Sequence, residues 1–102
     1  MYKHIFESLI DNITQHYGIP IAQMFSKNKD YESVEPRHMF FYLCNKKNIP
    51  TITIQRHLDS LGYSIHHSSI LRGIAKINDK VTEVKDFDPL ISKLENVTSN
   101  VQ

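Results

Sequence analysis

The amino-acid sequence predicts an all-α fold, a compact domain of about six helices over residues 1–102. Apolar residues recur at three- and four-residue spacing in successive segments, as they do along one side of a helix. Glycine occurs only three times and proline four times, which favours long helices over many short strands. The longest alternation of polar and apolar residues is Thr51–Ile54, and Pro50 before it makes a helix start the better interpretation.

The first half of the chain is expected to contain three helices. Gly18 ends the first, because glycine readily takes the left-handed conformation that closes a helix. Pro20 suits the first position of a short second helix, and Pro36 suits that of a third. A polar stretch without helical periodicity separates the second helix from the third. The expected bounds are 2–17, 19–25 and 36 to about 48, with the loop at 26–33.

The second half is expected to contain three more helices. Thr51 or Thr53 can cap the first of them, because a side-chain oxygen accepts hydrogen bonds from helix N–H groups. Ser64 can cap the second and Asp88 the third, and a three-residue turn beginning at Gly62 separates the first two. The expected bounds are 51–61, 65–80 and 89–97, and the middle helix is expected to bury Ile70, Ile74, Ile77 and Val81.

Charge is unevenly distributed along the chain. The net charge is +1, but residues 37–80 hold seven Lys or Arg and only two Asp or Glu, between two acidic flanks. This basic segment is either a surface for an anionic ligand or a solvated face with uneven charge. No apolar run approaches the roughly 20 residues of a membrane span. The single cysteine, Cys44, is expected to be buried, and together with the absence of a signal-like start it favours a cytoplasmic location.

Segments 51–61 and 65–80, with the turn between them, have the proportions of a helix-turn-helix. In such a unit the second helix enters the major groove of DNA, with its N-terminal residues at the base edges. A plain helical hairpin with a polar outer face remains the alternative from geometry alone. The residues that would face DNA are Ile65, His66, His67, Ser68, Ser69, Arg72 and Lys76.

Four short motifs occur in order along the chain. They are Tyr17-Gly18-Ile19 through Phe25-Ser26-Lys27, Pro36-Arg37-His38-Met39 with Tyr42-Leu43, His67-Ser68-Ser69-Ile70 after Leu61-Gly62, and Ile74-Ala75-Lys76-Ile77. Together they resemble the C-terminal DNA-binding domain of the bacterial replication initiator DnaA, over roughly residues 10–95. The resemblance implies a Trp-repressor-like fold with a helix-turn-helix at about 51–80. It also implies sequence-specific binding of double-stranded DNA in the initiation of replication at an origin, or in its regulation.

The resemblance further implies which side chains meet DNA. The first turn of the recognition helix would read bases with His66, His67, Ser68 and Ser69, next to Ser64. Phosphates would be held by Arg37, His38, Arg72, Lys76 and the loop residues Lys27 and Lys29. Tyr31 stands where the family has an arginine that reaches into the minor groove.

A second hypothesis rests on the departures from the family pattern. Besides Tyr31 in place of arginine, the loop region carries the acids Asp30, Glu32 and Glu35. The chain would then be a protein-interaction module with a degenerate DNA-binding surface, which modulates a replication initiator or a helicase loader. An exposed, contiguous patch formed by Tyr31, Phe41 and Tyr63 would favour it.

No catalytic or cofactor site is expected. The adjacent His66 and His67 diverge by about 100° on a helix, so they are poorly placed to hold one metal ion. No pair of cysteines and no glycine-rich phosphate loop occurs in the sequence. We therefore expect no enzyme activity, metal, cofactor or nucleotide, and DNA and replication proteins, rather than a membrane, as partners.

The histidines predict a pH dependence of DNA binding. His38, His66 and His67 all fall at expected contact positions, and histidine gains its charge between about pH 8 and 5. A nearby phosphate favours the protonated form. Affinity is therefore expected to rise as the pH falls from about 7.5 to 6.

Overall fold

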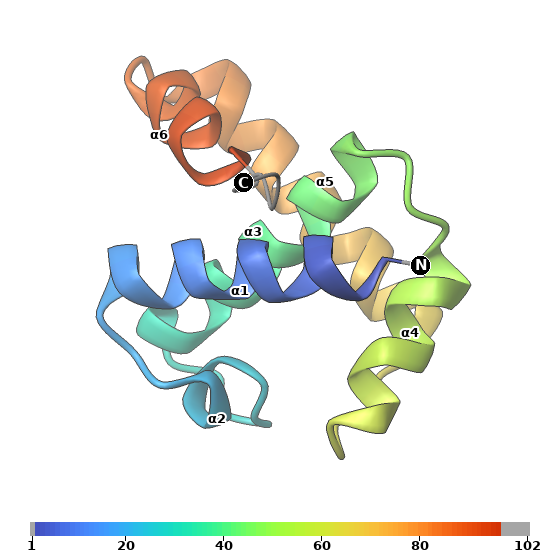
Figure 1. Cartoon of the computed structure of the whole chain (residues 1–102). Helices are drawn as coiled ribbons and strands as arrows, with labels where there is room; N and C mark the ends of the chain where they lie inside the picture. The colour runs from blue at the N-terminus through green and yellow to red at the C-terminus, as the bar shows by residue number, and fades with distance from the viewer. Residues whose placement is uncertain (1, 97–102) are drawn as a thin grey trace, which may run out of the picture.

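The structure, a computed structural model, describes residues 2–96. These residues form six α-helices and no strand, which confirms the all-α prediction (Figure 1). The helices are α1 Lys3–Tyr17, α2 Ile21–Met24, α3 Tyr31–Lys46, α4 Thr51–Ser60, α5 His67–Glu83 and α6 Phe87–Leu94.

Helix α3 is the centre of the fold. It packs against α1, α2, α4 and α5, most extensively against α5, and α1 runs across its front in Figure 1. Its middle turns place several fully buried side chains between these neighbours, and each gains about 1.5–3 kcal/mol by leaving water. The largest fully buried side chains are Leu9, Ile13, Met24, Met39, Phe40, Phe41, Leu43, Ile54, Leu58, Ile70, Ile77 and Ile91. One continuous core therefore joins helices from both halves of the chain.

The end of α1 forms as predicted. Gly18 has φ 67°, and its N–H donates to the carbonyl of Thr14 at 2.8 Å. A residue with a Cβ rarely adopts this left-handed conformation, so glycine is the natural choice. The apolar stripe of α1 faces α3 and the core, and Tyr17 in the last turn reaches Glu35 of α3.

Helix α3 begins five residues earlier than predicted, at Tyr31 instead of Pro36. Its first turn is closed by the N–H groups of Ser33 and Val34, both of which donate to the carbonyl of Asp30 at 2.9 Å. Pro36 has no N–H for the carbonyl of the residue four positions earlier. That residue, Glu32, is exposed, so its carbonyl can be solvated and the proline is tolerated inside the helix.

The starts of the last three helices also differ from the prediction. Thr51 is the first residue of α4 rather than its cap, and α4, α5 and α6 have no side-chain capping hydrogen bond. Helix α5 begins at His67 and continues to Glu83, and α6 begins at Phe87. Pro89 lies in the first turn of α6. The N–H groups of a first turn have no acceptor within the helix, so the proline costs the helix no hydrogen bond. The predicted end of this helix, Val97, lies outside the described residues.

Helices α3 and α5 approach closely at Gly73. A Cβ added there would lie 2.7 Å from Cδ2 of His38 and 2.9 Å from Cδ2 of Phe41. Ile70, Gly73 and Ile77 are the buried positions of α5. The predicted stripe is therefore correct in part, because Ile74 and Val81 are only partly buried at its edge.

Candidate DNA-binding surface

The segment between α4 and α5 is a six-residue connection, longer than the predicted three-residue turn. Gly62 has φ 86°, and the N–H of Tyr63 donates to the carbonyl of Leu58 at 2.9 Å. The Tyr63 side chain then points into the protein, only 7% exposed. Gln55 of α4 donates to the carbonyl of Ile65 at 2.9 Å. These bonds fix where α5 starts relative to α4.

A surface hollow of about 360 Å³ opens beside the start of α5. Its lining comes from the loop after α2, from α3, from the connection after α4 and from α5. It contains eight of the predicted DNA-contacting residues: Lys27, Lys29, Arg37, His38, Ser64, His66, Ser69 and Arg72. Ser26 and the largely apolar residues Phe41, Tyr63 and Ile65 complete it. Residues from four separate segments of the chain thus meet at one place, which we call the α3–α5 hollow.

The other predicted contact residues lie outside the α3–α5 hollow. His67 and Ser68 are exposed in the first turn of α5, and Lys76 is exposed two turns further on. Tyr31 is 69% exposed at the start of α3, and its hydroxyl donates to Oε1 of Glu35 at 2.6 Å. This tyrosine therefore belongs to a polar cluster of its own.

Arg37 has an internal role. Its side chain is only 8% exposed, and its Nε donates to the carbonyl of Met24 at 2.8 Å. A terminal guanidinium nitrogen donates to the carbonyl of Asn28 at 2.9 Å. The charge of Arg37 lies at the α3–α5 hollow, but its hydrogen bonds hold the loop between α2 and α3.

Lys27 ties the same loop to the helix-turn-helix. Its Nζ donates to the carbonyl of Ser64 at 2.7 Å and lies 4.8 Å from the ring centroid of Tyr63. The guanidinium carbon of Arg37 lies 6.0 Å from the centroid of the same Tyr63 ring. The loop that carries Lys27 and the exposed Lys29 is therefore positioned against the connection before α5.

His38 does not titrate where the sequence predicts. Burial lowers its pKa to about 4, with further lowering by the positive charges of Arg37, Lys76, Lys80 and Arg72. In the free protein His38 is thus neutral at physiological pH, and its expected protonation between pH 7.5 and 6 is wrong. His66 and His67 are exposed, and their predicted role in DNA binding stays a prediction.

The aromatic patch expected for a protein-interaction module does not form. Phe41 is 1% exposed and belongs to the core, and Tyr63 is 7% exposed beneath Lys27. Tyr31 is the one member of the expected patch with a largely exposed side chain. Phe41 and Tyr63, which would have supported that hypothesis, are instead part of the buried core.

The arrangement of α4, the connection and α5 agrees with a comparison against protein families. A family model described as the bacterial dnaA protein helix-turn-helix matches residues 6–77. The chain belongs to this family. The match begins slightly before the motif resemblance at residues 10–95 and ends within α5, so α6 lies beyond it. Comparison with curated proteins and with solved structures found no significant match.

Membership of the DnaA helix-turn-helix family makes this a DNA-binding type of domain, associated with the initiation of replication. The DnaA-type fold is not a catalytic one. Within residues 2–96, no helix is long and apolar enough to cross a membrane. No group of three or more His, Cys, Asp or Glu in that part of the chain is placed to hold a metal ion.

The predicted site residues omit two residues that interact with them in the structure, Lys80 with His38 and Glu35 with Tyr31. Lys80 lies one turn beyond Lys76 on α5, and its charge acts on His38. The four-residue spacing of Arg72, Lys76 and Lys80 is the signal that points to it. Glu35, which the sequence shows only as one of several acids, is the partner of Lys80.

Proposed function

We propose that this chain binds double-stranded DNA sequence-specifically through its DnaA-type helix-turn-helix and acts in replication initiation or its regulation. The observation that supports the proposal is the α3–α5 hollow, where the start of α5 meets a loop carrying two lysines. Family membership supports DNA as the partner. Specific recognition needs base contacts and phosphate contacts from one rigid surface, and this surface supplies side chains for both.

The first turn of α5 is proposed to read bases. Hydroxyl and imidazole groups donate to or accept from base edges. The residues with this proposed role are Ser64, His66, His67, Ser68 and Ser69.

Phosphate contacts are proposed for the exposed cations around these residues. Lys29, Arg72 and Lys76 have exposed side chains and carry the main attraction to phosphate. Lys27, Arg37 and His38 lie at the same hollow and mainly hold its shape. Tyr31 is proposed to lie at the edge of the bound duplex, where its exposed ring can contact the sugar-phosphate backbone.

The proposal assigns binding to one helical domain, residues 1–102, acting in the cytoplasm. It involves DNA and replication proteins as partners. It needs no nucleotide, cofactor, metal, membrane or catalytic step, because hydrogen bonding and charge account for recognition.

Selection from a random pool tests the specificity. Duplexes that the protein retains are sequenced, and a shared motif is expected. Anisotropy titration then compares the selected duplex with a scrambled one across salt concentrations. Arg72→Gln is expected to reduce the salt slope by about one, whereas Lys93→Gln, an equal charge change on α6, leaves it unchanged.

A protein that binds no duplex in a salt-sensitive manner contradicts DNA binding. Capture of a replication initiator or helicase loader by such a preparation would instead support the protein-interaction module. Salt-sensitive binding without a shared motif would support DNA binding but contradict sequence specificity.

A further inference from the structure

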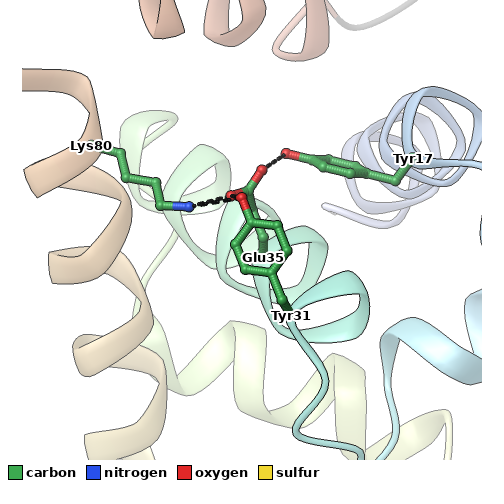
Figure 2. Close-up of polar contacts among 4 residues, drawn as sticks. All are labelled: Tyr17, Tyr31, Glu35 and Lys80. Atoms are coloured by element: carbon green, nitrogen blue, oxygen red, sulfur yellow. Dashed lines mark hydrogen bonds and ion pairs between the residues drawn. The ribbon is translucent and has the colours of Figure 1, made fainter. Parts of the chain in front are cut away.

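A polar cluster joins α1, α3 and α5 (Figure 2). Its centre is the carboxylate of Glu35, which is only 9% exposed. The hydroxyl of Tyr17 donates to Oε2 at 2.7 Å, and that of Tyr31 donates to Oε1 at 2.6 Å. The ammonium of Lys80 forms an ion pair with the same Oε1. Both carboxylate oxygens are therefore occupied.

The charges of this cluster are well defined at neutral pH. Burial acts to raise the pKa of Glu35, but hydrogen bonds from Lys80, Tyr31 and Tyr17 outweigh it and hold the pKa below its ordinary value. Burial acts to lower the pKa of Lys80, and its bonds to Glu35 and Tyr31 reverse the effect and raise it. Glu35 is thus a carboxylate, and Lys80 is an ammonium ion.

Lys80 is the last cation of a row on α5. Arg72, Lys76 and Lys80 are spaced by four residues and so lie along one side of the helix, and the charges of all three act on His38. We call these residues the basic row. Arg72 and Lys76 are exposed. Lys80 differs, because its Nζ is bound to Glu35 and lies 4.8 Å from the ring centroid of Tyr31.

We propose that Glu35 attenuates DNA binding by holding Lys80, so that one phosphate contact of the basic row is withheld. The inference rests on the proposed function and names Glu35 as a residue that lowers the affinity for DNA and its salt dependence. The Glu35–Lys80 pair adds no net charge to the surface, and it keeps the lysine stem directed toward α3. Lys80 remains 32% exposed and Tyr31 69% exposed, so this end of the row is at the surface where a phosphate can reach it.

Three variants and the wild type test the inference by anisotropy with one duplex between about 50 and 200 mM salt. Glu35→Gln frees Lys80 and is expected to steepen the salt slope by about one. The ratio of the variant's affinity to that of the wild type is then about 3.5-fold greater at 50 mM salt than at 200 mM salt. Glu32→Gln removes the same charge from an exposed position on α3 and is expected to leave the slope unchanged. The double variant Glu35→Gln/Lys80→Gln has the net charge of the wild type and is expected to return to its slope.

The outcomes separate this inference from the proposed function. If the wild type shows no salt-sensitive binding, the proposed function itself fails. If the wild type binds and Glu35→Gln does not steepen the slope, or the double variant steepens it equally, the attenuating role of Glu35 is overturned. Circular dichroism establishes that each variant is folded.

A second measurement needs no variant. Lysine acylation of the wild-type protein, read by mass spectrometry, compares the protection of Lys76 and Lys80 when DNA is added. Protection of Lys76 with no added protection of Lys80 is expected. Equal protection of both would show that Lys80 already contacts DNA and would overturn the inference, even if Glu35→Gln failed to fold.

Discussion

Gly73 lets two helices approach because it has no side chain. Gly73→Ala would place a methyl group 2.7 Å from the ring of His38 and 2.9 Å from that of Phe41. Alanine improves helix propensity by about 1 kcal/mol, but Phe41 is fully buried and has little room to move. Because overpacking costs about 1–3 kcal/mol, we expect a net loss of stability in urea unfolding. Asn78→Ala, at an exposed position of α5, is the control and should not destabilise the protein. A urea midpoint of Gly73→Ala at or above that of the wild type would contradict the overpacking of Gly73→Ala.

The exposed histidines at the start of α5 predict a pH-dependent affinity. His66 and His67 are exposed, and a phosphate near an imidazole favours its protonated form. Affinity should rise as the pH falls from about 7.5 to 6, by at most about tenfold per pH unit for each proton taken up. Replacing both residues with glutamine should flatten the profile in an anisotropy titration at constant salt.

His38 supplies the matched control for that experiment. Its pKa is lowered to about 4, so it is already neutral over the whole range tested. His38→Gln should therefore change the affinity at every pH by a similar factor and leave the slope of the profile intact. A flat profile for the wild-type protein would mean that His66 and His67 do not face phosphate.

At the scale of elements, the loop between α2 and α3 is held by side chains rather than by regular structure. Arg37 binds the carbonyls of Met24 and Asn28, and Lys27 binds that of Ser64. Lysine at position 37 keeps the charge but cannot reproduce the fork of guanidinium donors. The loop lysines owe their position near α5 to this fork.

Arg37→Lys is expected to lower the free energy of unfolding by about 1–3 kcal/mol, because a buried carbonyl loses its donor. DNA affinity should fall as well, since Lys27 and Lys29 are no longer held near the connection before α5. Urea unfolding and anisotropy measure the two effects. Arg72→Lys makes the same substitution at an exposed site and should leave stability unchanged; equal stability of the two variants would contradict the anchoring role.

For the whole molecule, two partly buried histidines make stability depend on pH. Burial, with nearby positive charges, lowers the pKa of His38 from 6.5 to about 4, and burial also lowers the pKa of His57. The pKa of His38 is about 6.5 in the unfolded chain and about 4 in the folded protein. Between these two pH values the unfolded chain binds a proton that the folded protein does not, so stability falls as the pH falls from about 6.5 to 4. We expect His38 to account for at most about 2 kcal/mol between pH 7 and pH 5, and for less in proportion to the solvent screening at this half-buried site.

Urea unfolding at several pH values measures this loss. His38→Gln should reduce the dependence of stability on pH in that range, whatever it does to stability at pH 7. Glu35 does not contribute to this loss between pH 7 and pH 5. Its pKa is lowered in the folded protein, so the stability that the charged carboxylate provides is lost only below the ordinary value of 4.5. A wild-type stability that is constant from pH 7 to pH 5 would contradict the burial of a neutral His38.

The helices and their order follow from local sequence, whereas several helix starts do not. Periodic apolar residues and Gly18 act within one or two turns, so the sequence alone predicts α1 and the all-α fold. The predicted caps at Ser64 and Asp88 failed because cap preferences are weak beside tertiary packing. Pro36 was expected to start α3, but α3 begins at Tyr31, whose hydroxyl binds Glu35 one turn later.

Local sequence patterns are enough to predict the fold class, the helix-turn-helix and most of the residues gathered at the α3–α5 hollow, because ordered motifs carry that information. Which cations are exposed depends instead on how the helices pack. Arg37 and Lys80 are bound internally, while Arg72 is exposed, although all three are basic residues in helices. The physical reason is that an ion pair depends on distance in space, and Glu35 and Lys80 are 45 residues apart in the chain. No local pattern reports that distance; the packing of α3 against α5 sets it.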